Sequence, residues 1–159
     1  MEVNGITLLL VEDDDVDAEA IQRAFRQQRI ANPFVVARDG VEALAMMRAP
    51  GALPYPYIVL LDINLPRMNG LEFLEAVRDD PALARTIVFV LTTSDRDEDK
   101  MAAYSHHVAG YILKSRAGED FLEVVQLLKV YWRLVEFPPA AGGPAAGGPL
   151  AGEPLAEQP

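Results

Sequence analysis

The sequence contains no cysteine and no long apolar run. Without cysteine the chain can form neither a disulfide nor a thiolate metal site, which suits a reducing cytoplasm. No apolar segment approaches the roughly 20 residues that span a bilayer. The first five residues lack the basic flank and the apolar stretch of a secretory signal. We therefore expect a soluble, cytoplasmic protein without a membrane partner.

Positive charge is scarce as well. Lys and Arg number 14 against 24 Asp and Glu, which gives the 159 residues a formal net charge of −10. A nucleic-acid-binding surface needs clustered Lys and Arg to contact phosphates, so we expect no nucleic-acid partner. The length indicates one domain with enough residues to bury a core.

Short apolar runs alternate with longer amphipathic ones along most of the chain. This alternation predicts βαβ units in an α/β fold, a three-layer doubly wound (βα)5 domain with a five-stranded parallel sheet of the flavodoxin-like type. The expected strands are residues 6–11, 34–37, 58–61, 87–91 and 110–113. The expected helices are residues 17–28, 40–48, 70–78, 97–106 and a last one from 118 to about 136.

The composition changes at Pro138. From there the sequence reads PPAAGGPAAGGPLAGEPLAEQP, which offers too little apolar bulk for a core. We predict one folded domain over residues 1–137, with an extended last helix, and a disordered Pro/Gly/Ala tail over residues 138–159.

Polar side chains follow four of the five expected strands. In the stretch VEDDDVD (residues 11–17), Glu12 and Asp13 follow the first strand. Asp62 follows the third strand, Thr92 the fourth and Lys114 the fifth. Ligands of open parallel sheets bind beyond the carboxyl ends of the strands, so we expect these five side chains to converge at one edge.

Acceptance of a phosphoryl group by a carboxylate needs such a set. We expect Asp62 to attack phosphorus and form an acyl phosphate, while Lys114 neutralises one phosphoryl oxygen and Thr92 donates a hydrogen bond to another. Clustered carboxylates repel each other and the donor, so we expect Mg²⁺ among them. Its expected ligands are Asp13, Asp62, the backbone carbonyl of Asn64 and, through a water, Glu12.

The remaining acids of residues 11–17 have another expected role. Asp14, Asp15 and Asp17 are predicted to cap and begin the first helix, where carboxylates favour the positive end of the helix dipole. The sequence does not decide whether Asp14 belongs with the site residues Glu12 and Asp13 or with the acids that begin the helix. His106 and His107 are adjacent, share no helix face and have no third ligand nearby in sequence, so we expect them in solvent.

The chain resembles the receiver domain of two-component response regulators over roughly residues 4–135. The resemblance rests on four motifs in order: LLLVEDD (8–14), LLDINLPRMNG (60–70), VLTTS (90–94) and GYILKS (110–115). It implies a phosphoacceptor that receives its phosphoryl group from a histidine kinase and whose only catalysis is its own Mg²⁺-dependent phosphorylation and dephosphorylation. The implied roles are Asp62 as phosphoacceptor, Asp13 and Asn64 as Mg²⁺ ligands, Glu12 in the acidic pair, Thr92 as switch hydroxyl, Tyr111 as switch aromatic and Lys114 as phosphate-contacting amine.

Two positions depart from the usual receiver pattern. Receivers usually carry Asp where Glu12 stands, and they usually follow the lysine with a proline in a cis peptide bond, where this chain has Ser115. A cis bond before a non-proline residue is costly, which leaves the geometry after Lys114 open. The KSR sequence, the proline-rich loop before the third strand and the lack of an output domain resemble the single-domain regulators that accept phosphoryl groups from phytochrome-type histidine kinases.

The last helix carries more apolar surface than one domain needs. One stripe is wide enough to pack on the sheet, and Leu127, Val130 and Leu134 fall on an adjoining face. We therefore predict a homodimer through the last helix, because such a patch usually marks an interface. The predicted interface residues are Leu127, Val130, Tyr131, Leu134 and Phe137. The alternative is that residues 130–137 fold back over their own domain.

Three other functions are compatible with this fold class. An aspartyl-nucleophile phosphatase of the haloacid dehalogenase type needs an acid two residues after its nucleophile, where this chain has Asn64. A flavodoxin-like FMN carrier needs a phosphate-binding loop after the first strand, where the acids of residues 12–17 would repel phosphate. A pseudo-receiver that binds partners without phosphorylation is disfavoured by the presence of Asp62, Asp13 and Lys114.

Overall fold

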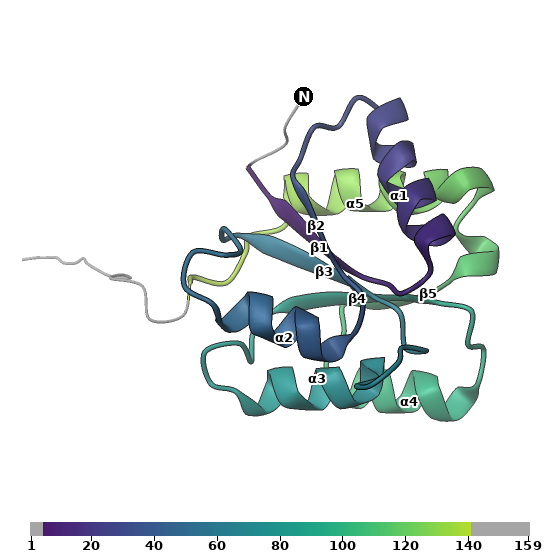
Figure 1. The fold of residues 1–159 in the computed structure, drawn as a ribbon. Helices are drawn as coiled ribbons and strands as arrows, with labels where there is room; N and C mark the ends of the chain where they lie inside the picture. The colour runs from purple at the N-terminus through teal and green to yellow at the C-terminus, as the bar shows by residue number, and fades with distance from the viewer. Residues whose placement is uncertain (1–4, 141–159) are drawn as a thin grey trace, which may run out of the picture.

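The computed structural model describes residues 5–140, which form a parallel sheet flanked by helices (Figure 1). The strands are β1 (Thr7–Val11), β2 (Phe34–Ala37), β3 (Tyr57–Leu61), β4 (Ile87–Thr92) and β5 (Gly110–Leu113). The helices are α1 (Asp15–Gln27), α2 (Gly40–Arg48), α3 (Gly70–Asp79), α4 (Asp97–Ser105) and α5 (Leu122–Leu134). Two short 3-10 turns, Lys114–Arg116 and Glu119–Phe121, connect β5 to α5.

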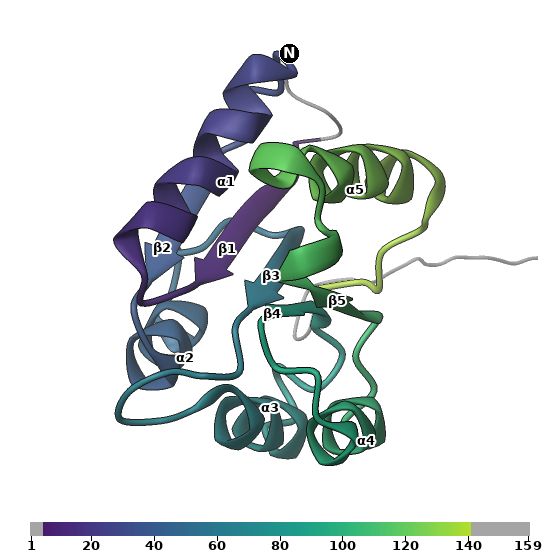
Figure 2. The same ribbon diagram turned by 90° about the vertical axis from the view of Figure 1, so that its right-hand side faces the viewer.

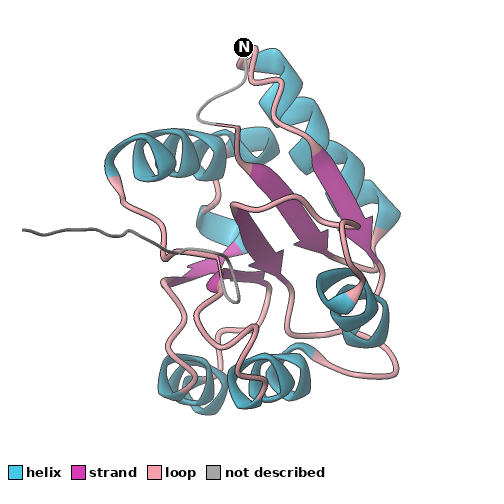
Figure 3. Cartoon of the chain, turned by 90° about the vertical axis from the view of Figure 1, so that its left-hand side faces the viewer, coloured by secondary structure: helices cyan, strands magenta, loops and turns pink. Residues whose placement is uncertain are grey.

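The sheet has the order β2-β1-β3-β4-β5, and every neighbouring pair is parallel. Helices α1 and α5 cover one face, and α2, α3 and α4 cover the other (Figures 1 and 2). Val11 at the end of β1 lies opposite both Ala37 and Leu61. The carboxyl ends of the strands therefore lie along one edge of the sheet, as the parallel arrows in Figure 3 show.

Two apolar clusters hold the three layers together. The cluster between the sheet and helices α1 and α5 contains Phe25 and Trp132, and the cluster on the opposite face contains Phe73 and Leu74. Strands β1 and β3 are buried along their whole length because both of their faces are covered. The predicted doubly wound (βα)5 fold is confirmed.

The last helix differs from the prediction at both ends. Gly118, Asp120 and Phe121 have positive φ angles of 86°, 51° and 63°, which interrupt a right-handed helix. As a result α5 begins at Leu122 instead of residue 118. It ends at Leu134, because Val135 is extended, with φ −97° and ψ 134°.

After α5 the chain runs across the amino-terminal end of the sheet. Phe137 packs against the core cluster of α1 and α5, and the hydroxyl of Tyr55 donates a hydrogen bond to the carbonyl of Pro138. The tail predicted from residue 138 lies, beyond residue 140, outside the described residues. Among residues 5–140, none of the helices combines the length and the apolar character that a membrane span requires.

Candidate functional site

Asp62 directly follows β3, and only 6% of it is exposed. Its Oδ1 accepts hydrogen bonds from the Thr92 hydroxyl at 2.8 Å and from the backbone N–H of Asn64 at 3.0 Å. Its Oδ2 accepts a hydrogen bond from the Lys114 ammonium at 2.9 Å. Donors from the ends of three strands thus fix the orientation of this carboxylate.

Lys114 joins three carboxylates just after β5. Its Nζ lies 2.8 Å from Glu12 Oε1, 2.7 Å from Asp17 Oδ2 and 2.9 Å from Asp62 Oδ2. Burial alone would lower the pKa of the Lys114 ammonium, but the hydrogen bonds to Asp17, Glu12 and Asp62 outweigh it and raise that pKa above its ordinary value. The ammonium therefore stays charged and balances part of the negative charge around it.

The peptide bond after Lys114 is trans. The cis peptide bond found within residues 5–140 is Tyr55–Pro56, so the question that Ser115 left open is answered. A non-proline residue strongly favours the trans form, and the chain changes direction through the 3-10 turn Lys114–Arg116.

A group of three carboxylates could hold a metal ion. One oxygen each of Glu12, Asp13 and Asp62 lies within 4.8 Å of the other two. Burial raises the pKa of Glu12 to about 7; the charge of Asp62 also raises it, and the hydrogen bond from Lys114 lowers it. The backbone carbonyl of Asp13 accepts a hydrogen bond from the Arg38 guanidinium at 3.0 Å, whereas its carboxylate accepts no hydrogen bond from residues 5–140. Closely spaced carboxylate oxygens are suitable ligands for a hard divalent cation such as Mg²⁺. The Asp13 carboxylate, which has no hydrogen-bond donor among the described residues, is available to bind it.

The structure brings together the five side chains that the sequence placed at the strand ends. It also settles the position of Asp14, which caps α1 by accepting hydrogen bonds from the backbone N–H groups of Val16 at 2.9 Å and Asp17 at 3.1 Å. Asp15 lies in the first helical turn and pairs with Arg38 instead of entering the site.

Asp17 is the site residue that sequence reasoning missed. The sequence predicts for it only a place at the start of the helix, yet its carboxylate accepts a hydrogen bond from Lys114. A signal was present in the spacing: Asp17, Ile21 and Ala24 are separated by four and three residues, so they share one helix face. Because Ile21 and Ala24 are fully buried against the sheet, that face also points Asp17 toward the strand ends.

Tyr111 and Thr92 are both linked to the loop after β4. The hydroxyl of Tyr111 donates a hydrogen bond to the carbonyl of Ser94 at 2.9 Å, and the backbone N–H of Ser94 donates to Thr92 Oγ1 at 3.3 Å. The Ser94 hydroxyl in turn donates to Asp99 in α4. A chain of hydrogen bonds therefore runs from Asp62 through Thr92 and Ser94 to Tyr111.

The residues predicted for a dimer interface divide into two groups. Leu127, Val130 and Leu134 on α5 are 44%, 45% and 73% exposed. Tyr131 and Phe137 instead pack against the core of their own domain, where the ring of Tyr131 lies edge-on to Phe89 with centroids 5.0 Å apart. Of residues 130–137, for which a fold-back was the alternative, Tyr131 and Phe137 pack on their own domain, whereas Val130 and Leu134 stay exposed.

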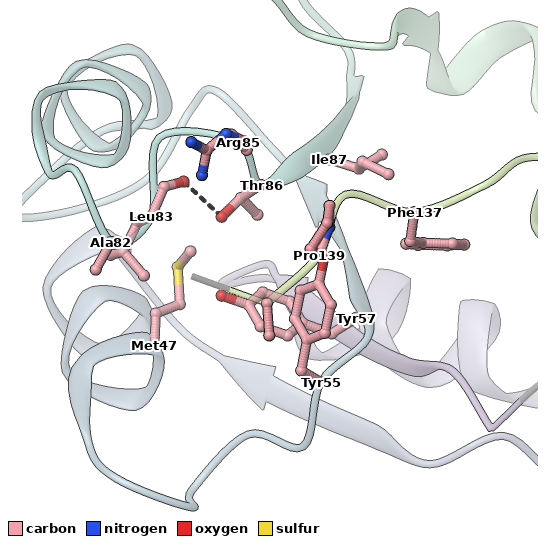
Figure 4. Close-up of a pocket in the computed structure, with 11 residues that line it drawn as sticks. Met47, Tyr55, Tyr57, Ala82, Leu83, Arg85, Thr86, Ile87, Phe137 and Pro139 are labelled. Carbon is pink, nitrogen blue, oxygen red and sulfur yellow. Dashed lines mark hydrogen bonds between the residues drawn. The ribbon is translucent and has the colours of Figure 1, made fainter. Parts of the chain in front are cut away.

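A cavity of about 230 Å³ lies at the opposite end of the sheet from Asp62. Figure 4 shows its lining, in which Tyr55, Tyr57 and Phe137 surround the space and Thr86 donates a hydrogen bond to the carbonyl of Leu83. Tyr57 begins β3, whereas Asp62 follows the end of that strand. The cavity is therefore separate from the carboxylate site.

Comparisons with known proteins agree on one family. Residues 8–126 match the response regulator receiver domain. The chain is 36% identical over 137 residues to response regulator Rcp1 of Synechocystis sp., which covers 84% of this chain and 93% of that protein. Its structure is similar to the crystal structure of the Mn²⁺-bound form of Rcp1, with a TM-score of 0.73, 36% identity, and coverage of 83% of this chain and 98% of that one. It is also similar to the phosphorylated cyanobacterial phytochrome response regulator RcpA, with a TM-score of 0.72, 32% identity, and coverage of 83% and 97%.

Proposed function

This chain belongs to the response regulator receiver family, and from that premise we propose that Asp62 accepts a phosphoryl group from a histidine kinase. The observation that carries the assignment is the convergence of Thr92, Asn64 and Lys114 on the Asp62 carboxylate beside Glu12 and Asp13. No other carboxylate of the described residues receives this combination of donors next to a possible metal site.

The transfer makes one bond and breaks one bond. An Asp62 carboxylate oxygen attacks the phosphorus of a phosphohistidine, and the phosphorus–nitrogen bond breaks with its electron pair going to the imidazole, which takes a proton from solvent. Lys114 neutralises charge on the phosphoryl oxygens, and Thr92 donates a hydrogen bond to them. The protein contributes position and charge compensation, so its role is that of a phosphoacceptor.

Mg²⁺ is the cofactor in this proposal. Asp13, Asp62 and the carbonyl of Asn64 would bind it directly, and Glu12 through a water. When bound, it would neutralise charge on the phosphoryl group. The crystal structure of Rcp1 in a Mn²⁺-bound form supports a divalent site in this family. An NMR titration with Mg²⁺ should shift resonances of residues 12–14, 62–64 and 114, whereas shifts confined to His106 and His107 would contradict the site.

The partner kinase in this proposal is of the phytochrome type. Support comes from the similarity to RcpA, a cyanobacterial phytochrome response regulator. A phosphotransfer assay against the purified histidine kinases of the source cell tests this part separately, since phosphorylation by a kinase of another type would retain the receiver function and reject the phytochrome link.

Asp62→Asn tests the phosphoacceptor directly. After incubation with Mg²⁺ and acetyl phosphate, the intact mass of the wild-type chain should increase by one phosphoryl group, and that of Asp62→Asn should not. Asp79→Asn is the matched control, because Asp79 is exposed at the end of α3. An unchanged mass together with hydrolysis of a phosphate ester would favour a phosphatase. An unchanged mass without such hydrolysis would favour a pseudo-receiver.

A switch and a dimer complete the proposal. Phosphorylation of Asp62 would strengthen the hydrogen bond that the Thr92 hydroxyl donates at this site. The loop around Ser94 would transmit the resulting change to Tyr111. Homodimers would form through the exposed face of α5 that carries Leu127, Val130 and Leu134. Tyr131 and Phe137 would support that face from behind, as parts of their own core.

A further inference from the structure

One of the carboxylates that accept a hydrogen bond from Lys114 belongs to a helix and not to the end of a strand. Lys114 has three N–H donors, and each of them has one acceptor: Glu12, Asp17 and Asp62. Glu12 and Asp62 follow strands, whereas Asp17 belongs to the first turn of α1. The Lys114 side chain is 9% exposed, so few water molecules can replace a lost partner.

Within residues 5–140 the carboxylate of Asp17 makes no hydrogen bond or ion pair other than the one to Lys114, and its side chain is 28% exposed. The cap of α1 is Asp14, whose carboxylate accepts one hydrogen bond from the backbone N–H of Asp17 and none from its side chain. Helix α1 is fixed by Ala18 and Ile21, which are buried against the sheet. Asp17 is therefore a fixed acceptor, 2.7 Å from the ammonium of Lys114, on a rigid element.

Phosphorylation changes the partners that Lys114 needs. Once Asp62 carries a phosphoryl group, the esterified carboxyl oxygen loses its charge, and the negative charge moves outward to the phosphoryl oxygens. One N–H of Lys114 must then turn from Asp62 to a phosphoryl oxygen. The other two N–H groups can keep Glu12 and Asp17, so that the ammonium pivots on two fixed acceptors.

We propose that Asp17 is a positioning residue that aims Lys114 at the phosphoryl group of Asp62. This inference rests on the proposed function and adds a residue to it. Asp17 does not touch the reacting atoms, and its effect passes through the hydrogen bond to Lys114. The opposite role, in which Asp17 only repels an incoming anionic donor, predicts the opposite sign for its removal.

The experiment compares Asp17→Ala, which removes the acceptor, with Asp17→Asn, which keeps an acceptor oxygen and removes the charge. Initial rates of phosphorylation by acetyl phosphate are measured by intact mass at saturating Mg²⁺. Asp17→Ala should be about tenfold slower, as expected for the loss of one charge-assisted hydrogen bond. Asp17→Asn should restore the rate to within about threefold of wild type.

Glu19→Ala is the matched control. It removes the same charge from the same helix, where Glu19 is exposed and pairs with Arg26, and it should phosphorylate at the wild-type rate. Binding of beryllofluoride, a phosphoryl mimic, should weaken about tenfold in Asp17→Ala, while the Mg²⁺ affinity measured by NMR changes less than about threefold.

Four results would overturn the proposal. They are an Asp17→Ala rate equal to or above the wild-type rate, an Asp17→Asn variant as slow as Asp17→Ala, an equal loss in Glu19→Ala, and a loss that Mg²⁺ affinity alone explains. If the wild-type chain gains no phosphoryl group, the proposed function fails and this inference falls with it. If the wild type gains one and Asp17→Ala matches it, only the inference fails.

Discussion

At the scale of single residues, the position of Asp62 depends on a glycine that has no functional group. Gly70 begins α3, and its N–H donates a hydrogen bond to the carbonyl of Ile63 at 2.8 Å. A Cβ at residue 70 would lie 2.6 Å from the backbone oxygen of Asp62 and 2.6 Å from Cα of Ile63. Backbone atoms cannot move aside as a flexible side chain can, so only glycine fits here.

We predict that Gly70→Ala displaces Asp62. The overpacking should cost about 2 kcal/mol of stability and should slow phosphorylation by acetyl phosphate more than this loss of folded protein explains. Chemical denaturation and intact mass measure the two effects. Gly110→Ala is the comparison, because its Cβ would meet only the Phe89 ring, at 3.2 Å. Equal effects of both substitutions would contradict the argument.

Thr92 is the residue that connects the carboxylate to the rest of the switch. It is fully buried and contacts both Asp62 and the backbone of Ser94. We predict that Thr92→Ala still accepts a phosphoryl group, because Lys114 and Asn64 continue to hold Asp62. The change in the Tyr111 ring resonances between the two phosphorylation states should shrink. Thr86→Ala, at the residue just before β4, is the control, and an unchanged Tyr111 response in Thr92→Ala would reject this coupling.

At the scale of elements, an ion pair links α2 to the loop that carries Asn64. Asp39 caps α2 by accepting a hydrogen bond from the N–H of Glu42 at 2.9 Å, and Arg67 Nε lies 2.6 Å from its Oδ2. The hydrogen bond from Arg67 and those from the helix backbone lower the pKa of Asp39 below its ordinary value. The loop after β3 is thereby tied to the amino-terminal end of α2.

This link predicts a specific dependence on pH. Because the pKa of Asp39 is lower in the folded chain than in the unfolded chain, ionised Asp39 stabilises the fold above about pH 4 and loses that effect as pH falls through its folded pKa. Arg67→Ala should raise the pKa of Asp39 toward its ordinary value, as measured by NMR titration of its carboxyl carbon. Arg48→Ala, which removes the partner of Asp80, should leave the Asp39 titration unchanged. An unaltered Asp39 pKa in Arg67→Ala would disprove the assignment.

At the scale of the whole molecule, α5 presents an apolar face to solvent. Leu127, Val130 and Leu134 are separated by three and four residues, so they lie on one side of the helix. On the other side, Val125, Leu128 and Trp132 are buried in the core. One self-complementary patch of this kind favours a two-fold dimer.

We predict that Val130→Glu combined with Leu134→Glu converts a dimer into a monomer. Opposed carboxylates in an apolar interface are unfavourable, whereas the same side chains on an exposed helix face of a monomer cost little. Light scattering on the full chain measures the mass. Met101→Glu, at an exposed position of α4, is the control and should remain dimeric. Truncation within α5 is a poorer test, because removing Trp132 would damage the core.

By itself the sequence determined the order of strands and helices and the group of Glu12, Asp13, Asp62, Thr92 and Lys114. Apolar runs and the turns between them define each strand locally, and the right-handed crossovers of a parallel sheet bring the carboxyl ends to one edge. Residues that work at those ends are therefore readable from their places along the chain.

Tertiary structure decided the contacts that join distant elements. Asp17 meets Lys114 because α1 docks on the sheet at one particular rotation, and Arg78 donates hydrogen bonds to the carbonyls of Ala84, Thr86, His106 and His107 because α3 lies between two loops. Phe137 packs against the core because α5 ends at Leu134 and the chain continues in an extended conformation at Val135. Local propensity fixes neither the rotation of a docked helix nor the path of a terminal segment, since both depend on packing among residues far apart in the sequence.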